Sequence, residues 1–380
     1  MSIIKKICLF SNEYPTKTDP VYSFVEQLCI GFAKRGIHVT VISPQSITSS
    51  LFHRTEIHPK YTVTMYDSGG SITVYQPFCI SLPFRFRKIN DWLFYKSAKK
   101  VIRNIGNDFD VVYSHFWRPG YIAYKIFKEK IPLFVATGES NIANMFDFNQ
   151  KITDFSRSVN GVIAVSSKNK KESISLKLAI EENIGVFPNA INNKIFFKRD
   201  KIETRKKLNI SSDLFIVAFV GWFNQRKGSL RVSNAIQSLH DDIYSFFIGT
   251  GDDEPKCDKI LFKGRLSHED IPLYLSAADV FVLPTLNEGC CNAVIEAMAC
   301  GLPIISSKLD FNYDVLDQSN SIMVDPNNID DLAEAIYKVK HDFNLRNKLA
   351  EGSLLKARSL TISQRVDNIL AFMNEKIINN

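Results

Sequence analysis

Residues 280–306 read VFVLPTLNEGCCNAVIEAMACGLPIIS, and this stretch is the clearest indication of the fold class. It opens on a short apolar run from Val280, which is typical of a buried strand in a parallel sheet. A polar loop follows, and then a run with apolar residues at helical spacing, which Gly301 ends. Pro303 opens a second apolar run. The stretch therefore predicts strand, loop, helix and strand, the repeating unit of an α/β fold with a parallel sheet.

The loop inside this stretch predicts an anion-binding site. We expect the helix to begin near Cys291 or Asn292, where its first amides have no partner within the helix and can bind phosphate. Gly289 lets a ligand approach the backbone closely. Glu288 and Glu296 are eight residues apart, one before the helix and one inside it, and each carboxylate can accept two hydroxyl hydrogens of a sugar. Alternatively, Glu288 stabilises the helix dipole and Glu296 is a solvated helix residue.

A second informative segment is residues 219–229, which read FVGWFNQRKGS. It follows an apolar run and opens a helical pattern, so it lies at the carboxyl end of a predicted strand. Gly221 and Gly228 bracket a loop that carries Arg226 and Lys227. A mobile ammonium beside a forked guanidinium suits a diphosphate group. The alternative is a surface turn with ordinary basic residues.

The alternation of strand and helix patterns extends along the chain, from Lys6–Phe10 to Ile322–Val324. It predicts an α/β fold with two doubly wound, Rossmann-like domains facing a cleft, although the sequence alone does not exclude a barrel. In such sheets ligands bind outside the carboxyl ends of the strands, where both segments above are expected to lie.

A boundary between the two domains is predicted near residues 188–193, where a turn-rich segment precedes a polar, charged stretch over Lys198–Lys207. We place the first domain at 1–190 and the second at 191–360. A last helix, 361–380, lies past the final strand and has an apolar stripe on one side. It must pack either on its own domain or back on the first.

Composition excludes several classes of protein. Of the 380 residues, 45% are hydrophobic and 23% charged, which is ordinary for a globular protein and unlike disordered, collagen-like or coiled-coil chains. No apolar run reaches the roughly 18 residues of a membrane-spanning helix, and the first residues do not resemble a signal peptide. The seven cysteines form no Cys-x-x-Cys pair, so we expect buried, reduced thiols in a cytoplasmic protein.

The net charge is concentrated in the first half of the chain. Residues 1–190 carry 24 Lys and Arg against 15 Asp and Glu, a net charge of +9, and residues 191–380 carry a net charge of −2. The densest cluster lies at 83–88, where aromatic and basic residues alternate, and continues through Lys96, Lys99, Lys100 and Arg103. This pattern suits peripheral contact with an anionic membrane. The alternative is a solvated helix face.

Together the two segments resemble the family 4 glycosyltransferases, retaining enzymes with the GT-B architecture. The family's Glu-x7-Glu element matches Glu288 to Glu296, and its Gly-Arg-x4-Lys-Gly element matches Gly221 to Gly228. Residues 188–191 resemble the family's linker signature, Pro-Asn-Gly-Val. The resemblance is specific in the second half of the chain and looser in the first.

The resemblance implies a role for each matched residue. Lys227 would pair with the diphosphate of the donor, Glu288 would hold the hydroxyl groups of the transferred sugar, and Glu296 would bind the ribose. His115, at the end of a strand in the first domain, would reach the sugar, unless it is a satisfied buried histidine. The implied catalytic residues are therefore His115, Lys227 and Glu288. The implied donor-binding residues are Gly221, Arg226, Lys227, Gly249, Arg265, Glu288, Gly289, Cys290, Cys291, Asn292 and Glu296.

The activity implied is transfer of a hexose from UDP- or GDP-hexose to a hydroxyl of a glycan or lipid-linked acceptor, in cell-surface polysaccharide synthesis. The protein would work in the cytoplasm or on the inner face of the membrane. No cofactor or metal is expected, because Arg226, Lys227 and the helix amides supply positive potential. Asp108 and Asp110 match a metal-binding Asp-x-Asp pattern, but they precede a strand instead of following one.

The chain departs from the family pattern at three places. Trp222 replaces the family's Arg, and Arg226, four residues on, can supply the charge from another direction. The early loop at Lys17–Phe24 lacks the family's Gly pair. Glu139 ends a segment where a second family His often occurs.

Rival functions remain open on the sequence alone. One is another enzyme of the same architecture, such as a sugar-nucleotide epimerase or a glycan phosphorylase, which would need a pyridoxal-bearing lysine. Another is a transferase-like scaffold that binds a sugar nucleotide or a partner without turnover, which Trp222 favours. Nucleic-acid binding has only the positive charge in its favour and no motif, so we expect none.

Overall fold

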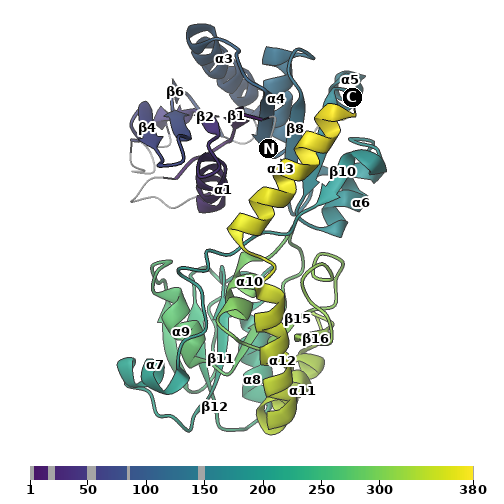
Figure 1. The fold of residues 1–380 in the computed structure, drawn as a ribbon. Coiled ribbons are helices and arrows are strands. Elements are labelled where there is room, and N and C mark those ends of the chain that lie inside the picture. The colour runs from purple at the N-terminus through teal and green to yellow at the C-terminus, as the bar shows by residue number, and fades with distance from the viewer. Residues whose placement is uncertain (1–3, 16–21, 49–56, 84–85, 144–149, 380) are drawn as a thin grey trace. The chain divides into compact units, whose positions relative to one another are not determined.

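A computed structural model of the chain describes residues 4–15, 22–48, 57–83, 86–143 and 150–379. The chain divides into two compact units, Met1–Phe187 with Ile362–Asn380, and Pro188–Thr361. The predicted boundaries after residues 190 and 360 lie next to these bounds, and the terminal helix groups with the first unit (Figure 1).

The first unit contains an eight-stranded sheet in the order β10-β9-β8-β7-β1-β2-β5-β4. Its strands are β1 Lys6–Phe10, β2 His38–Ile42, β4 Tyr61–Met65, β5 Ser71–Tyr75, β7 Val111–His115, β8 Leu133–Thr137, β9 Val159–Ala164 and β10 Ile184–Val186. Two short strands, β3 Gln45–Ser46 and β6 Phe78–Cys79, form a separate pair. Its helices are α1 Ser23–Ala33, α3 Arg87–Ile105, α4 Trp117–Phe127, α5 Gln150–Arg157, α6 Ser167–Ser175 and α13 Ile362–Ile378.

Helices cover both faces of this sheet because successive side chains of a strand point to opposite faces. In β1, Ile7 and Leu9 join a core cluster with residues of α1 and α13. Cys8 and Phe10, between and beyond them, join a second cluster with residues of α3 and α4. The doubly wound arrangement predicted for this half is confirmed. One strand differs: β4 runs antiparallel to β5, and all five of its residues are exposed.

The terminal helix α13 completes the core of the first unit. Its apolar stripe, Val366, Ile369, Leu370 and Met373, is buried in the same cluster as residues of α1 and the sheet. Gly31 on α1 allows this approach, because a Cβ there would lie 2.5 Å from Val366 Cγ2. Of the two predicted docking places, the helix therefore uses the first unit.

The second unit contains a six-stranded, all-parallel sheet in the order β13-β12-β11-β14-β15-β16. Its strands are β11 Phe215–Val220, β12 Ile243–Ile248, β13 Ile260–Gly264, β14 Val280–Leu283, β15 Ile304–Ser307 and β16 Ser321–Val324. Its helices are α7 Lys201–Lys207, α8 Ser229–Ser238, α9 Ile271–Ala277, α10 Asn292–Ala299, α11 Ile329–His341 and α12 Phe343–Ala357. Helix α8 packs against α11, and α10 packs against α9 and α12. The second predicted doubly wound fold is confirmed, with no closed barrel.

The polar stretch after the boundary contains helix α7, which its charged sequence did not predict. Asp200 caps the helix by accepting from the Glu203 amide. Arg205 is buried, and its Nη2 lies 2.7 Å from Asp279 Oδ2, at the start of β14. This ion pair fixes the helix to the amino edge of the sheet.

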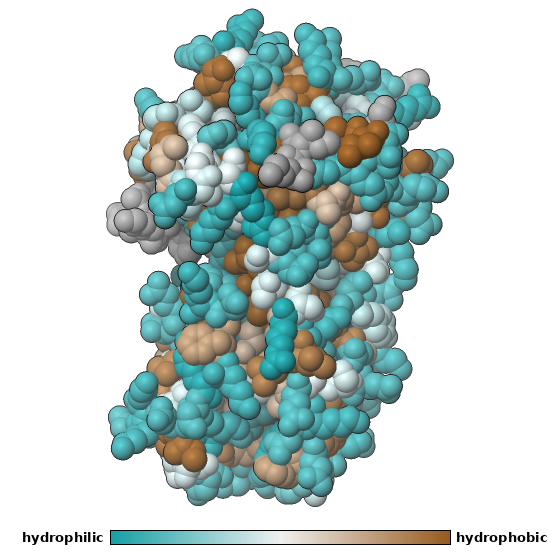
Figure 2. All heavy atoms as spheres, in the orientation of Figure 1, coloured by the Kyte–Doolittle hydropathy of each residue, from teal (hydrophilic) through white to brown (hydrophobic). Residues whose placement is uncertain are grey.

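No helix in the described ranges combines the length and apolar character needed to cross a membrane. On the face drawn in Figure 2, hydrophilic residues predominate and apolar residues occur in small groups.

Candidate active site

The two informative loops meet at the carboxyl edge of the second sheet. Strands β11 and β14 are neighbours, and the strand order reverses between them, which makes this the switch point of the sheet. The loop after β11 carries Arg226, and the loop after β14 carries Leu286, whose amide donates to the Arg226 carbonyl at 2.8 Å. The backbone therefore holds the basic and acidic segments side by side.

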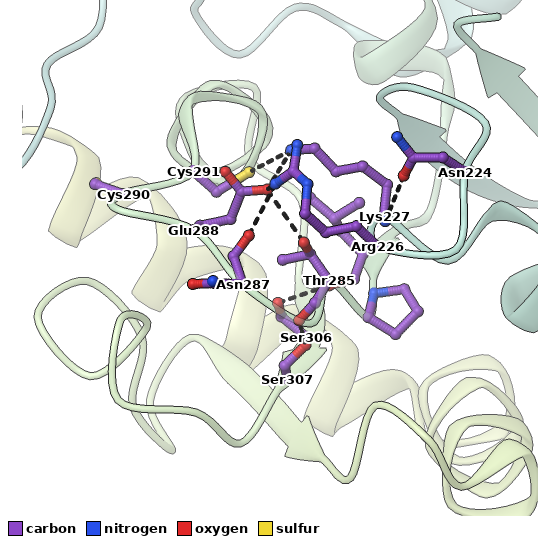
Figure 3. Close-up of polar contacts among 12 residues, drawn as sticks. Asn224, Arg226, Lys227, Thr285, Asn287, Glu288, Cys290, Cys291, Ser306 and Ser307 are labelled. Carbon is purple, nitrogen blue, oxygen red and sulfur yellow. Dashed lines mark hydrogen bonds and ion pairs between the residues drawn. The ribbon is translucent and has the colours of Figure 1, made fainter. Parts of the chain in front are cut away.

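Glu288 is the centre of a charged cluster, shown in Figure 3. Its Oε1 lies 2.5 Å from Arg226 Nη1 and 2.7 Å from Lys227 Nζ. Thr285 Oγ1 donates to the same oxygen at 3.1 Å. Arg226 Nη1 also donates to the Asn287 carbonyl at 2.8 Å. The structure thus brings together three residues that the sequence predicted for the site, although it did not predict their direct pairing.

The cluster combines partial burial with an excess of positive charge. The side chains of Lys227 and Glu288 are 13% and 15% exposed, and that of Arg226 is 41% exposed. Burial lowers the pKa of Lys227, but the neighbouring Cys291 and Glu288 outweigh it, so that the pKa lies above its usual value. Lys227 therefore stays charged, and two cations face one carboxylate, which leaves positive charge for an anionic ligand.

Helix α10 begins at Asn292, as predicted, with Cys291 at its N-cap position. Asn189, from the linker after β10, holds the turn before it, because its Nδ2 donates to the Cys290 carbonyl at 3.2 Å and to Asn292 Oδ1 at 2.8 Å. Lys227 Nζ lies 3.9 Å from Cys291 Sγ. The start of the helix, where amide groups favour anions, therefore adjoins the Lys227 ammonium.

Glu296 lies on α10, and His268 Nε2 is 3.2 Å from its Oε1. The hydrogen bond to Glu296 raises the pKa of His268, against the effect of burial. The ring of Phe196 packs on the imidazole at a centroid distance of 5.0 Å. Sequence analysis did not single out His268, whose only signal is its place in the loop after β13.

Three further donor-binding candidates lie at the ends of β11, β12 and β13. The Gly221 amide donates to the Ile248 carbonyl at 3.0 Å, and the Gly249 amide donates to the Gly264 carbonyl at 2.8 Å. A Cβ at Gly249 would lie 1.9 Å from the Gly221 carbonyl oxygen, so only glycine fits where these loops converge. Arg265 follows β13 and is exposed.

His115 ends strand β7 in the first unit and is buried. Burial, with a smaller contribution from Arg365 on α13, lowers the pKa of His115 to about 3, so the imidazole is neutral at physiological pH. The rings of Phe24 and Phe116 lie 4.9 and 4.5 Å from it. Within the described ranges its Nδ1 has no hydrogen-bond partner. The alternative hypothesis was a buried histidine with its hydrogen bonds satisfied. His115 is buried, as that hypothesis requires, but its Nδ1 is not hydrogen-bonded to any described residue.

Glu139 follows β8 and is also buried. It accepts from the Trp117 amide at 3.1 Å, from Thr137 Oγ1 at 2.6 Å and from the Gly138 amide at 2.9 Å. Burial raises the pKa of Glu139, and these donors oppose the shift. Because Trp117 opens α4, the carboxylate anchors the turn that directly follows His115.

The other residues considered in the sequence analysis are Trp222, the early loop, the basic cluster and the Asp-x-Asp pattern. Trp222 is 58% exposed at the end of β11. Residues 16–21 of the early loop lie outside the described residues, as do Phe84 and Arg85 of the basic cluster. Asp110 Oδ2 accepts from the backbone amides of Lys5 and Lys6, at 2.6 and 2.8 Å, and Asp108 pairs with Lys6. The described part of the chain contains no group of three or more potential metal-binding His, Cys, Asp or Glu side chains.

Two family models match the chain. Residues 200–354 match the model for glycosyl transferases group 1, and residues 21–194 match the model for glycosyltransferase family 4. A curated relative, the putative teichuronic acid biosynthesis glycosyltransferase TuaC of Bacillus subtilis, is 27% identical over 89% of this chain and 90% of its own length. The UDP-Gal:alpha-D-GlcNAc-diphosphoundecaprenol alpha-1,3-galactosyltransferase of Escherichia coli is 27% identical over 57% of this chain and 61% of its own.

Solved structures share the fold over the whole chain. Sucrose-phosphate synthase from Thermosynechococcus elongatus has a TM-score of 0.78 at 18% identity, covering 99% of this chain and 100% of that one. HepE from Anabaena, in complex with UDP and glucose, has a TM-score of 0.69 at 16% identity, covering 98% and 100%. The fold is thus that of a GT-B glycosyltransferase.

With both halves of the chain matched, the protein belongs to the family 4 glycosyltransferases. It is a transferase with relatives in polysaccharide synthesis.

Proposed function

We propose that this enzyme transfers a hexose from a nucleotide diphosphate sugar to a hydroxyl group of a glycan or lipid-linked acceptor, with retention of configuration, in cell-surface polysaccharide synthesis. The observation that carries the proposal is the cluster of Arg226, Lys227 and Glu288 beside the start of α10. A carboxylate held between two cations fits a ligand that has a sugar at one end and phosphates at the other.

The donor diphosphate would lie against Lys227, Arg226 and the first amides of α10. Breaking the bond between C1 of the sugar and the phosphate oxygen puts negative charge on the leaving diphosphate. Preorganised donors act most strongly where charge develops, so these groups would stabilise the transition state more than the ground state. Because the protein supplies the positive charge, the reaction requires no metal in this proposal.

Glu288 would accept hydrogen bonds from hydroxyls of the hexose, and Glu296 from the ribose of the nucleotide. The acceptor oxygen would attack C1 on the face from which the diphosphate leaves, and its proton would pass to the departing phosphate oxygen. Retention rests on the family resemblance. A UDP donor is supported by the HepE complex and by the name of the E. coli relative.

The test is a donor screen that measures release of UDP or GDP from a panel of sugar nucleotides, with and without lipid-linked and glycan acceptors. We expect acceptor-dependent release from one donor class, and full activity in EDTA. Loss in EDTA with recovery on adding Mg²⁺ or Mn²⁺ would refute the metal-free part.

Two other results would replace the proposal itself. Conversion of the sugar nucleotide into its epimer without nucleotide release would indicate an epimerase. Tight donor binding without turnover on any acceptor would indicate the scaffold that Trp222 favours.

A further inference from the structure

Helix α3 carries a stripe of exposed side chains that belong to neither described core cluster of the first unit. The stripe consists of Ile89, Trp92, Lys96, Lys100 and Arg103, which we call the α3 stripe. Their spacings of three, four, four and three residues place them along one side of the helix. The two apolar members are 45% and 53% exposed, and the three cations are exposed as well.

The opposite side of the same helix is the one that packs. Ala98 and Ile102 are buried in a core cluster of the first unit. Asp91, also on that side, pairs with Arg118 of α4 at 2.5 Å. Packing of α3 on the core therefore does not require apolar side chains at Ile89 and Trp92, on the exposed side.

The charge of α3 is strongly one-sided. Of its seven charged side chains six are basic, and the one acid, Asp91, is turned toward α4. The ammonium of Lys96 lies over the ring of Trp92 at 5.3 Å, and Lys125 of α4 lies over the ring of Tyr95 at 5.2 Å. The stripe thus carries apolar side chains near its start and cations along the rest, with no carboxylate among them.

We propose that the α3 stripe docks this enzyme on an anionic lipid bilayer. Nineteen residues make a helix about 28 Å long, enough to lie flat across several lipid headgroups. Ile89 and the indole of Trp92 would enter the interface, where amphipathic rings are favoured, and the cations would meet lipid phosphates. A nucleic acid would satisfy the cations alone and leave the apolar pair in water.

This inference deepens the proposed function by naming where the enzyme meets a lipid-linked acceptor. The two proposals can fail separately, because lipid binding is measured without donor and donor binding is measured without lipid.

The first experiment is co-sedimentation of the full chain with vesicles of phosphatidylcholine, with and without phosphatidylglycerol. We expect binding only to the anionic vesicles, and release at about 0.5 M NaCl as the charges are screened. The variant K96S/K100S/R103S should bind about 100-fold more weakly, since each basic residue near such a surface contributes about a factor of five. UDP affinity should be unchanged in this variant, because the proposed donor site lies in the second unit, and urea unfolding compared with the parent reports whether the first unit is still folded.

The matched control removes the same number of charges elsewhere. Lys206, Lys207 and Lys348 are exposed on the second unit, and K206S/K207S/K348S should keep vesicle binding within about a factor of five, the contribution of one basic residue. Equal loss in both variants would show that net charge alone binds lipid, and would overturn the assignment to α3. So would absence of binding to anionic vesicles at low salt, or equally strong binding to duplex DNA.

A second experiment uses the tryptophans of the chain, of which there are three. Trp117 is fully buried, so in W222F the response to an aqueous quencher reports Trp92. On anionic vesicles we expect a blue shift of the emission and protection from iodide, and W92F should show no comparable change. An unshifted, fully quenchable Trp92 on bound vesicles would overturn the proposed insertion.

Discussion

The carboxyl edges of the two sheets carry polar residues in different environments. At the carboxyl edge of the second sheet, Glu288 shares one oxygen with Arg226 and Lys227 in a partly exposed cluster. At the carboxyl edge of the first, His115 and Glu139 are buried, and the histidine is neutral. The same scaffold therefore supplies one edge suited to a multiply charged ligand and one edge fixed by packing. The predictions below alter each edge in turn.

The largest effect is expected from Glu288→Gln, which removes the charge but keeps the shape of the side chain. Transfer should fall about 100- to 1,000-fold, the loss typical of one preorganised contact in the transition state. The measurement is kcat with saturating donor. Asp241 is a matched control, because it also pairs with two basic side chains, Lys340 and His341. Asp241→Asn should keep kcat; if Glu288→Gln does too, Glu288 is not in the site.

The second prediction tests whether His115, at the carboxyl edge of the first sheet, is neutral. Unfolded histidine binds a proton near pH 6.5, whereas folded His115 does so only near pH 3. The unfolded state therefore binds more protons in this range, and stability falls as the pH falls. Between pH 6.5 and 5 the free energy of unfolding should decrease about 1.6 kcal/mol more than in His115→Gln, because one pKa unit is worth about 1.4 kcal/mol and the unfolded histidine is only half protonated at the upper limit.

Urea unfolding at several pH values measures that difference, and subtraction removes the titration of groups common to both proteins. Parallel curves for the two proteins would contradict it, and would mean that the imidazole is solvated and charged.

The third prediction concerns Glu296, which should bind the ribose. Glu296→Gln should weaken UDP about tenfold, the loss of one hydrogen bond to a charged group, and change kcat little at saturating donor. It should also lower the pKa of His268, which Glu296 raises. Calorimetry gives the affinity, and NMR titration gives the pKa. Glu334→Gln, an exposed change on α11, should alter neither.

If UDP affinity in Glu296→Gln equals that of the parent while the pKa of His268 falls, Glu296 only orients the histidine.

The smallest effect is expected at Trp222. Trp222→Arg adds a guanidinium at the end of β11, where it can meet the donor diphosphate. Because the side chain is largely exposed, the gain should be at most about 1 kcal/mol, or a three- to fivefold higher affinity for the donor. Trp222→Gln is the uncharged control. A weaker affinity in the arginine variant would show that Trp222 itself contacts the nucleotide.

Local patterns in the sequence predicted most of the second unit. The helix expected at the end of the Glu288 loop begins at Asn292. Its position could be predicted because the apolar run before the loop and Gly301 after the helix limit where it can lie. Helix α7 was not predicted, because its burial depends on the pairing of Arg205 with Asp279, a residue remote in the sequence. Strand β4 gave no alternating pattern to read, because both of its faces are exposed.

The site was predicted in its members but not in its pairings. The two loop segments indicated Arg226 and Glu288, yet their contact joins residues 62 positions apart and depends on β11 and β14 being neighbours. His268 was missed for the same reason, since only the fold brings it to Glu296. Nor does sequence show how completely β7 and β8 bury His115 and Glu139, the property that distinguishes the two edges.

The return of α13 to the first unit sets an order of events during synthesis. Residues up to Phe187 leave the ribosome well before Ile362, by roughly 10–35 s at about 5–20 residues per second. Throughout that interval the apolar residues of the first sheet that share a core cluster with α13, including Phe134 and Ile163, lack that helix. The second unit, whose residues are continuous, can fold in the meantime. The first unit, which is synthesised first, is therefore the last to complete its core. Until α13 packs on it, a chaperone could bind its exposed apolar residues.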